Sequence, residues 1–264
     1  MVIDGLRQSV KLNPETISQL AQRHTGVGFD QCLLVEPARE QGVDFNYRIF
    51  NADGQEVGQC GNGARCLALF IQQMGLSDKT QWIVSTSTTR MKLALATGNQ
   101  ISVWMPPPRF APEQIPMLAA HEAETYVLPL SNEGQLKVYS VNVGNPHAVT
   151  LVDDVDSAPV EKIGHLISHH AYFPEQCNAG FMQVVDKHSL RLRVYERGCG
   201  ETQACGSGAV AAAVIGRRFL DMAESIRVSL PGGDLQIQWS GQDDEIIMTG
   251  PAVLVYQGEL FTCV

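Results

Sequence analysis

A chain of 264 residues that is 44% hydrophobic and 18% charged can bury a sizeable core, as one large domain or as two modest ones. Its formal net charge of −9 would repel phosphate backbones, which argues against a nucleic-acid partner. The uncharged Ala-rich stretch from Gln203 to Gly216 is shorter than the roughly 20 residues of a membrane-spanning helix, so we expect no membrane span.

The cysteines and the first residues bear on the cellular compartment. The chain has seven cysteines and no C-x-x-C pair, which argues against a disulfide framework and against a structural zinc site. Asp4 and Arg7 interrupt the N-terminal segment before an apolar signal region can form. We therefore predict a cytoplasmic protein.

The first predicted element is a helix with Asn13 as its N-cap and Pro14 in the first helical position. We expect Gly26 to end this helix. Its apolar side is predicted from positions spaced at i, i+3, i+4 and i+7, which are Ile17, Leu20, Ala21 and His24.

A strand, a Gly-rich loop and a second helix follow, and the same series recurs later in the chain. Apolar residues alternate at positions 43, 45, 47 and 49, and again at 190, 192 and 194, which is the period of a half-buried strand. The helix after the later loop carries an Ala-rich run over residues 209–215. The helix after the first loop is expected to bury Ala64, Leu67, Ala68 and Ile71 on one face. Each copy is therefore predicted to be α+β.

These two segments are copies of one another. Residues 47–64, YRIFNADGQEVGQCGNGA, align without a gap on residues 192–209, LRVYERGCGETQACGSGA, at an offset of 145. Nearby offsets extend the match, because residues 28, 29 and 31 fall on 180, 181 and 183, and residues 84 and 85 fall on 228 and 229. Identical pairs in the ungapped segment include Arg48 with Arg193, Glu56 with Glu201, Cys60 with Cys205 and Gly63 with Gly208.

The duplication predicts two pseudosymmetric domains, residues 1–115 and 116–264, divided near the Pro-rich stretch MPPPRFAPEQIP. Residues 252–264 are candidates to return to the first half. Residues 144–155 precede the first helix of the second copy, and their second half aligns with Val2–Leu6 at an offset of 149. Nothing in the first copy aligns with Gly144–His147, so we expect the chain to begin within its first strand.

Cys60 and Cys205 each stand where a Gly-rich turn should open a helix. Exposed N–H groups and the helix dipole at such a start can lower a thiol pKa and can bind a carboxylate. If the two copies pack about a pseudo-twofold axis, the two cysteines face each other across a cleft between the domains. One thiolate and one thiol on opposite sides of a carbon suit proton removal from one side and delivery from the other, which inverts a stereocentre.

At this point the sequence resembles the diaminopimelate epimerase family over almost its whole length. The matching segments are GVGFDQ (26–31), FNADGQEVGQCGNGARC (50–66), GNPHAV (144–149), CNAGFMQVV (177–185) and YERGCGETQACGSGA (195–209). The resemblance implies two domains, each a curved, mostly antiparallel sheet around a central helix. It also implies interconversion of LL- and meso-diaminopimelate in lysine and peptidoglycan precursor synthesis, no metal or organic cofactor, and a homodimer.

The resemblance also implies roles for individual residues. Cys60 and Cys205 would be the catalytic pair, and His147 and Glu196 would assist proton transfer beside them. The carboxylate at the reacting centre would be held by Gly61, Asn62, Gly206 and Ser207. The far end of the substrate would be bound by Gln31, Asn51, Asn145, Asn178, Glu196 and Arg197, with Arg197 paired to the distal carboxylate.

Three features depart from the family pattern. The family usually begins with a strand and a G-x-GNDF-like segment whose asparagine contacts substrate. Because that segment is absent here, a truncated chain with weak or no activity is an alternative to the active enzyme. The turn STSTTRM replaces a Gly-containing turn, which predicts a different local backbone there. Cys199 adds a thiol for which we have no functional account. The other cysteines lack the glycine context and are interpreted as packing residues, namely Cys32, Cys66, Cys177 and Cys263.

Other functions fit parts of the same pattern. A racemase of another amino acid, such as proline or hydroxyproline, would share the fold, but Arg197 argues against it because a distal carboxylate needs a cation. A thiol redox protein would use Cys60 with Cys66 or Cys205 and would form a reversible disulfide as its working state. A truncated chain that binds ligand without turnover is the third alternative. Glu56 and Glu201 repeat in both copies, which favours a structural role near the helix starts.

Overall fold

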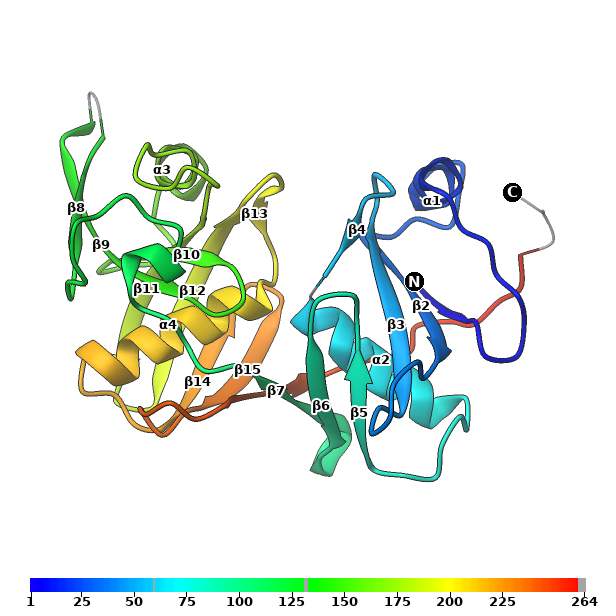
Figure 1. Ribbon diagram of the computed structural model, residues 1–264. Helices are drawn as coiled ribbons and strands as arrows, with labels where there is room; N and C mark the ends of the chain where they lie inside the picture. The colour runs from blue at the N-terminus through cyan, green and yellow to red at the C-terminus, as the bar shows by residue number, and fades with distance from the viewer. Residues whose placement is uncertain (59, 131–132, 261–264) are drawn as a thin grey trace. The chain divides into compact units, whose positions relative to one another are not determined.

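The chain forms two compact units (Figure 1). The computed structural model describes residues 1–58, 60–130 and 133–260. Unit 1 comprises Met1–Trp104 and Gly250–Val264, and unit 2 comprises Met105–Thr249. Ile115, which the sequence placed at the end of the first half, is buried in the core of unit 2.

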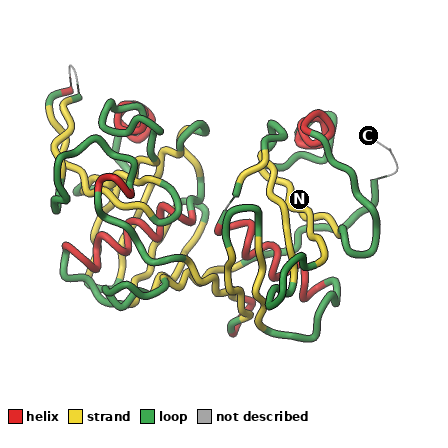
Figure 2. Tube along the Cα trace, in the orientation of Figure 1, coloured by secondary structure: helices red, strands yellow, loops and turns green. Residues whose placement is uncertain are grey.

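The described residues of unit 1 form two α-helices and seven strands, which Figure 2 colours by type. The strands run in the order β1-β2-β3-β5-β6-β7, and β4 pairs with β3. Only β1–β2 and β3–β5 are parallel among these pairs. The elements are β1 (Val2–Asp4), α1 (Pro14–Ala21), β2 (Gln31–Pro37), β3 (Phe45–Asn51), β4 (Glu56–Val57), α2 (Gly61–Gln73), β5 (Gln81–Ser85), β6 (Arg90–Leu95), the 3₁₀ turn Thr97–Asn99 and β7 (Gln100–Met105).

The start of α1 is confirmed and its end is corrected. The Asn13 side chain accepts a hydrogen bond from the Thr16 N–H at 2.8 Å, and Pro14 occupies the first turn. The helix ends at Ala21, well before the predicted Gly26. The Leu20 carbonyl instead accepts from the Val27 and Gly28 N–H groups in a turn, so His24 falls outside the helix and is exposed.

The prediction that β3 is half-buried is wrong, because both of its faces are covered. Phe50 packs with Cys32, Leu34 and the apolar side of α1 in one core cluster. The alternate residues, such as Ile49 and its partner Leu33 on β2, point to the other face. There α2 packs against β2, with Ala64, Leu67, Ala68 and Ile71 fully buried as predicted.

Unit 2 repeats this plan with additional strands. Its elements are the 3₁₀ turn Pro112–Gln114, β8 (Tyr126–Pro129), β9 (Gln135–Asn142), β10 (Pro146–Leu151), α3 (Val160–Ser168), β11 (Asn178–Asp186), β12 (Ser189–Glu196), β13 (Gly200–Thr202), α4 (Gly206–Phe219), β14 (Ser225–Leu230), β15 (Gly233–Gln238) and β16 (Ile246–Pro251). Only β10–β11 and β12–β14 are parallel among its strand pairs. No helix in the described ranges is long and apolar enough to cross a membrane.

The central helix of unit 2 is α4. Its Ala-rich run from Ala209 to Ile215 is buried on every side, because the strands β9 to β12, β14 and β15 all contact it. The other face of the same sheet is covered by α3, and a Cβ added at Gly164 would lie 2.5 Å from that of Tyr195. Each unit is thus a mostly antiparallel sheet wrapped on a central helix, the predicted α+β architecture.

The strand registers confirm the duplication and correct part of the alignment. Phe45 pairs with Val84 and Leu190 with Val228, as the offsets predicted. Two other offsets are wrong, the offset of 152 for residues 28–31 and the offset of 149 for Val2–Leu6. Leu33 pairs with Ile49 and Gly180 with Val194, so β2 and β11 correspond at an offset of 147, rather than 152.

The same reasoning corrects the first strand. Val2 pairs with Leu33, and Val149 pairs with Gly180, so β1 matches β10 at an offset of 147, rather than 149. Short matches of up to three residues cannot fix a register, because register is set by the hydrogen bonds of the neighbouring strand. Gln31 therefore corresponds to Asn178, a relation that the sequence comparison missed.

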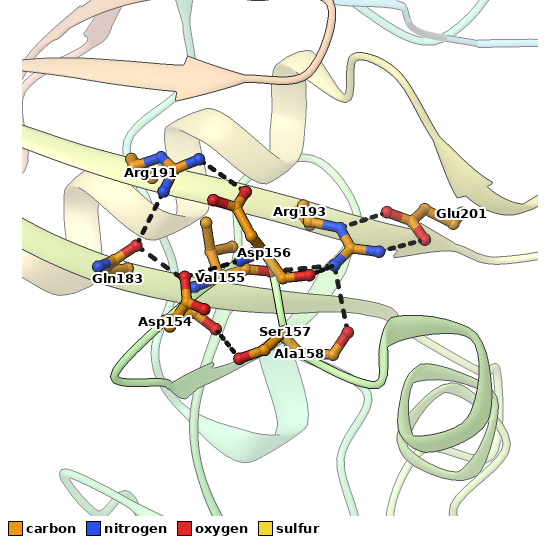
Figure 3. Close-up of polar contacts among 9 residues, drawn as sticks. All are labelled: Asp154, Val155, Asp156, Ser157, Ala158, Gln183, Arg191, Arg193 and Glu201. Carbon is orange, nitrogen blue, oxygen red and sulfur yellow. Dashed lines mark hydrogen bonds and ion pairs between the residues drawn. The ribbon is translucent and has the colours of Figure 1, made fainter.

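A duplicated ion pair joins the strand to the loop in both units. Arg48 donates two hydrogen bonds to the Glu56 carboxylate, at 3.1 and 2.7 Å, and Arg193 donates two to Glu201, at 2.6 and 2.8 Å. In unit 2 the Arg193 guanidinium also donates to the backbone carbonyls of Val155, Asp156 and Ala158 (Figure 3). The two glutamates therefore have the structural role that their repetition indicated, as partners of arginines rather than as helix caps.

We expect Arg193→Met to lower the free energy of unfolding by about 2 kcal/mol, because it leaves a half-buried carboxylate and three carbonyls without their donor. The side chains of Arg193 and Glu201 are 22% and 21% exposed, against 36% and 34% for Arg48 and Glu56. The matched variant Arg48→Met should therefore cost less than about 1 kcal/mol. Urea denaturation checks both values, and equal losses in the two variants would contradict the assigned role of the carbonyl contacts.

Candidate active site

The two glycine-framed cysteines have the same local geometry. Cys60 is the N-cap of α2 and Cys205 is the N-cap of α4, each with an extended backbone. The Cys60 sulfur accepts a hydrogen bond from the Gly63 N–H at 3.3 Å, and the Cys205 sulfur accepts one from the Gly208 N–H at 3.4 Å. Each thiol thus takes the place of the serine or aspartate oxygen that usually satisfies a first-turn N–H group.

The second glycine of each motif is required by packing. A Cβ at Gly208 would lie 2.9 Å from the Val194 side chain and 3.2 Å from the Cys205 sulfur. A Cβ at Gly63 would lie 3.2 Å from the Leu33 side chain. These glycines let the start of each helix pack closely against the sheet.

In unit 1, two further predicted site residues come together at the ends of adjacent strands. Gln31 pairs with Asn51 in the β2–β3 ladder, and its side-chain amide donates to the Asn51 carbonyl oxygen at 3.0 Å. Both side chains lie on the face of the sheet that α2 covers, since they share that face with Leu33. Gly61 and Asn62 form the first residues of α2, directly after Cys60.

The turn that departed from the family pattern has a structural role that the sequence did not reveal. The Thr86 and Thr88 hydroxyls both donate to the Gly58 carbonyl, at 2.7 and 3.0 Å. These two hydrogen bonds hold the Gly58 carbonyl, and Gly58 lies two residues before Cys60 in the sequence. A Cβ at Gly58 would lie 2.2 Å from the Thr88 hydroxyl, which leaves room only for glycine there.

In unit 2, Glu196 is in direct contact with the thiol. The Cys205 sulfur donates to Glu196 Oε2 at 3.1 Å, and the Ser207 hydroxyl lies 3.6 Å from the same sulfur. The Thr202 hydroxyl donates to Glu196 Oε1 at 2.5 Å. Thr202 was missed by sequence reasoning, although the alignment held a signal, because the corresponding residue of the first copy is Val57.

These contacts keep Cys205 protonated. Burial raises the pKa of the Cys205 thiol well above its usual value, and the Glu196 carboxylate raises it further by charge and by hydrogen bonding. The contacts from Ser207 and the Gly208 N–H lower this pKa but are smaller effects. The N–H group of Gly208 at the helix start does lower this pKa, as expected, but burial and the carboxylate outweigh it at Cys205.

A second cluster of unit 2 joins His147 to two asparagines. His147 Nε2 lies 3.0 Å from Asn145 Oδ1 and 3.4 Å from Asn178 Nδ2. The Asn178 carbonyl oxygen accepts from the Arg197 backbone N–H at 2.8 Å, which fixes the orientation of this amide. The exposed Arg197 guanidinium donates to the Glu175 carbonyl at 2.9 Å.

His147 is a neutral base in this setting. Its side chain is fully buried, and burial, together with the charge of Arg197, lowers its pKa to about 3. The shorter contact, to Asn145 Oδ1, requires the hydrogen to be on Nε2. Nδ1 is then a lone-pair acceptor, and it has no hydrogen-bond partner among the residues that the structure describes.

The remaining cysteines divide into two groups. Cys32 and Cys177 are fully buried, which confirms their interpretation as packing residues. Cys66 is exposed, so that interpretation is wrong for it, because it lies on the side of α2 opposite Ala64, Leu67 and Ala68. Cys199 is exposed in the turn before β13. Cys263 lies outside the described residues.

The described residues were also compared with the requirements of a metal site and of a ligand cavity. Within residues 1–58, 60–130 and 133–260, no group of three or more His, Cys, Asp or Glu side chains is arranged to hold a metal ion. A cavity of about 480 Å³ opens in unit 2 beside α3. It is lined by Glu161, Lys162, His165 and Tyr195, among others, and by none of the predicted site residues.

Comparison with known proteins identifies the family. A family model described as diaminopimelate epimerase matches residues 1–111 and 139–255. The chain is 56% identical over 262 residues to the diaminopimelate epimerase of Legionella pneumophila (strain Corby), covering 99% of this chain and 95% of that protein. It is 53% identical over 260 residues to the diaminopimelate epimerase of Chromobacterium violaceum, covering 98% and 94%.

Solved structures share the fold at low sequence identity. A phenazine biosynthesis protein of the PhzF family from Bacillus anthracis superposes with a TM-score of 0.67 at 16% identity, over 95% of this chain and 90% of that one. A hydroxyproline epimerase from Agrobacterium vitis superposes with a TM-score of 0.65 at 15% identity, over 89% and 77%. Since the sequence relatives match along nearly their whole length, the chain belongs to the diaminopimelate epimerase family.

Proposed function

We propose that Cys60 and Cys205 are the acid and base with which this cofactor-independent epimerase interconverts LL- and meso-2,6-diaminopimelate, in lysine and peptidoglycan precursor biosynthesis. The observation that carries the proposal is the duplicated N-cap, in which each sulfur accepts the N–H of the glycine three residues ahead. Cysteines that serve only to pack the core would not require the same N-cap geometry in both copies. Two matched thiols suit a reaction that treats two sides of one carbon alike.

In the proposed reaction a thiolate removes the α-hydrogen of the substrate as a proton, and the other thiol delivers a proton to the opposite side. The electron pair of the broken C–H bond is held by the α-carbon and its carboxylate until the new C–H bond forms. At the end of each turnover the former base is a thiol and the former acid is a thiolate. Exchange with solvent restores the starting state.

The charge that develops on the substrate carboxylate needs hydrogen-bond donors. We assign this role to the first residues of α2 and α4, whose backbone N–H groups have no intrahelical acceptor and whose helix dipoles favour an anion. Fixed donors of this kind stabilise developing charge without reorganising during the reaction. The residues are Gly61, Asn62, Gly206 and Ser207.

The far end of the substrate carries an ammonium and a carboxylate. We assign the carboxylate to Arg197, whose exposed guanidinium donates to the Glu175 carbonyl. Gln31, Asn51, Asn145 and Asn178 are the proposed polar partners of this end. Glu196 contacts Cys205 and Thr202 instead, which favours its role as a helper of the thiol over a role in binding.

His147 is the proposed second helper. Its low pKa keeps the imidazole neutral at physiological pH, so it can act only through the lone pair on Nδ1 or through the hydrogen on Nε2. The hydrogen on Nε2 is already engaged by Asn145. We therefore assign the lone pair of Nδ1 as the hydrogen-bond acceptor through which His147 would assist proton transfer.

Isotope exchange tests the proposed function. Incubated in D₂O with LL-diaminopimelate, the protein should place deuterium at one α-carbon and yield meso product, as followed by proton NMR. L-Proline and trans-4-hydroxy-L-proline, tested in parallel, should show no exchange, because they lack the distal carboxylate that Arg197 would bind. Exchange of a proline substrate alone would replace the proposal by the racemase alternative, and exchange of none would contradict both.

The proposed setting is a cytoplasmic homodimer, which rests on the family resemblance. A redox function is the alternative from another class, and it requires a disulfide as the working state. Among the described residues, no disulfide joins Cys60 to Cys66 or to Cys205. Sedimentation of the protein under reducing conditions tests the dimer, since a single species of 28.8 kDa would contradict it.

A further inference from the structure

One residue of unit 2 has a backbone conformation that glycine usually occupies. Gln176 lies in the connection between α3 and β11 and has a φ of +59°. This left-handed region is costly for a residue with a side chain, because the Cβ comes close to the following carbonyl oxygen. Costly backbone conformations persist only where the surrounding structure holds them, and they are concentrated at functional sites. The conformation of Gln176 therefore calls for an explanation.

The turn that contains Gln176 is anchored in the core of unit 2 on both sides. Phe173 and Cys177 are 2% and 0% exposed and belong to the same buried cluster. The Cys177 N–H donates to the Ser168 carbonyl at 3.2 Å. The Gln176 N–H donates to the Phe173 carbonyl at 2.8 Å. Packing and hydrogen bonds thus hold the backbone of this turn, although Glu175 itself is exposed.

The same turn contacts Arg197 at two points. Arg197 Nη1 donates to the Glu175 carbonyl at 2.9 Å, and the Arg197 backbone N–H donates to Asn178 Oδ1 at 2.8 Å. The four consecutive residues 175–178 therefore hold both the backbone and the guanidinium of this arginine. A guanidinium has five N–H donors in a planar fork, so one bond to a carbonyl fixes its direction and still leaves donors for a carboxylate.

The sign of φ at Gln176 decides the direction of the Glu175 carbonyl. That carbonyl and the Gln176 N–H belong to one rigid peptide plane. Rotation of the plane by half a turn would make φ at Gln176 negative, which suits any side chain. The same rotation would turn the carbonyl away from Arg197 and the N–H away from the Phe173 carbonyl. The costly φ is therefore the condition under which Arg197 keeps its carbonyl acceptor.

The corresponding connection of unit 1 differs in both respects. At the offset of 145, Arg197 corresponds to Ala52, which has no charge to orient. Between α1 and β2 a positive φ of +79° falls on Gly28, where no side chain opposes it. Unit 1 thus places glycine in the left-handed region, whereas unit 2 places glutamine there beside an arginine. The difference links the conformation of Gln176 to the guanidinium.

We propose that Gln176 is a positioning residue for substrate recognition. Its left-handed backbone aims the Glu175 carbonyl at Arg197 and so holds the guanidinium in the orientation that binds the distal carboxylate of the substrate. This rests on the proposed function, in which Arg197 binds that carboxylate. An arginine that is already oriented loses less freedom when a ligand binds, so the affinity is higher. The effect falls on binding, because the turn acts at the end of the substrate far from the reacting carbon.

Substitution of Gln176 in the whole protein tests the proposal. Valine is β-branched and avoids positive φ more strongly than glutamine, so Gln176→Val favours the rotated peptide plane. With LL-diaminopimelate, its KM should rise about tenfold while kcat stays within about twofold of the parent value. Gln176→Gly accepts positive φ without a side chain, so its KM should stay within about twofold. An unchanged KM in Gln176→Val overturns the proposal, and so does an equal rise in Gln176→Gly, because the side chain would then act.

Two controls distinguish this effect from a general loss of stability. Asn99 has a φ of +58° in the turn between β6 and β7 of unit 1, so Asn99→Val introduces a similar strain in the other unit. Both valine variants should lower the thermal midpoint of unfolding, but only Gln176→Val should raise KM. In an Arg197→Gln background, Gln176→Val should lower kcat/KM no further, because the guanidinium that it positions is gone. A further tenfold loss in that background would contradict the proposal.

The orientation of Arg197 can also be measured without a substrate. Phenylglyoxal modifies exposed guanidinium groups, and peptide mass spectrometry reports the rate at Arg197. Loss of the carbonyl contact should make Arg197 react about threefold faster in Gln176→Val than in the parent protein or in Gln176→Gly. If this rate rises but the parent protein does not epimerise diaminopimelate, the role of Gln176 stands and the proposed substrate fails. If diaminopimelate is epimerised and neither KM nor this rate changes, the epimerase function stands without this role.

Discussion

Serine in place of Cys60 or of Cys205 is expected to lower the interconversion of LL- and meso-diaminopimelate by about three orders of magnitude or more. General acid–base catalysis by one positioned group contributes roughly 10²- to 10⁴-fold, and a serine hydroxyl is a far weaker acid than a thiol at physiological pH. The measurement is the initial rate of conversion in each direction. Undiminished turnover in either variant would refute the assignment of two acid/base groups.

The single variants also separate removal of a proton from its delivery. In Cys205→Ser, the remaining thiolate of Cys60 can remove the α-proton of one isomer and return a deuteron to the same side. We therefore expect exchange with retention for one of the two isomers, and for the other isomer in Cys60→Ser. Equal exchange of both isomers in one variant would indicate a mechanism with a single base.

Matched control variants are present in the chain. Cys66 follows Cys60 by six residues on the exposed side of α2, and Cys199 precedes Cys205 by six residues in an exposed turn. Cys66→Ser and Cys199→Ser should keep full activity, because neither thiol is placed at a helix start. A loss in Cys66→Ser comparable to that of Cys60→Ser would favour the redox alternative.

The second large effect is expected from Glu196→Gln, which should lower turnover by about 10²-fold. The carboxylate accepts the Cys205 hydrogen at 3.1 Å, so it both orients the thiol and keeps it protonated. Glutamine preserves the size of the side chain and its acceptance from Thr202, but it carries no charge. Thr202→Val, which introduces the residue of the first copy, should give a smaller loss, because it disturbs only the orientation of the carboxylate.

The Glu196→Gln substitution should also shift the pH dependence of Cys205 alkylation in a direction that follows from the structure. Glu196 raises the pKa of Cys205 through its charge and its hydrogen bond, so its removal lowers that pKa. Alkylation of Cys205 by iodoacetamide should therefore begin at lower pH in Glu196→Gln than in the parent protein, although burial still holds it above the usual value. A profile that stays in place or moves to higher pH would contradict the role of the carboxylate.

Local structure was largely predictable from residue patterns. The N-caps at Asn13 and at the two cysteines, and the buried faces of α2 and α4, follow from side-chain size and from the need of the first N–H groups of a helix for an acceptor. The predictions that failed concerned features that depend on contacts with segments distant in the sequence. The second face of β3 is buried because α1 covers it, and no alternation within the strand could reveal that.

The registers and the electrostatics of the thiols depended on the same kind of contact. Leu33 is matched to Gly180 by the hydrogen bonds of β3 and β12, whereas the few identical residues nearby suggested a match five residues away. Likewise a helix start alone predicts a low thiol pKa, but burial and Glu196 reverse the direction at Cys205. The sequence predicts a turn at Thr86 and Thr88. Only the tertiary structure shows that the hydroxyls of these two residues donate to the Gly58 carbonyl.

The residues by themselves determined that this protein is a doubled chain with two thiols at helix starts, because repetition, glycine spacing and capping are properties of short segments. Tertiary structure alone decided how the two copies differ: the Glu196 carboxylate accepts the hydrogen of the Cys205 thiol, whereas the corresponding Asn51 accepts a hydrogen bond from Gln31. The physical reason is that a thiol's tendency to ionise depends on solvent exclusion and on charges from other strands. Both are set only when those strands pack.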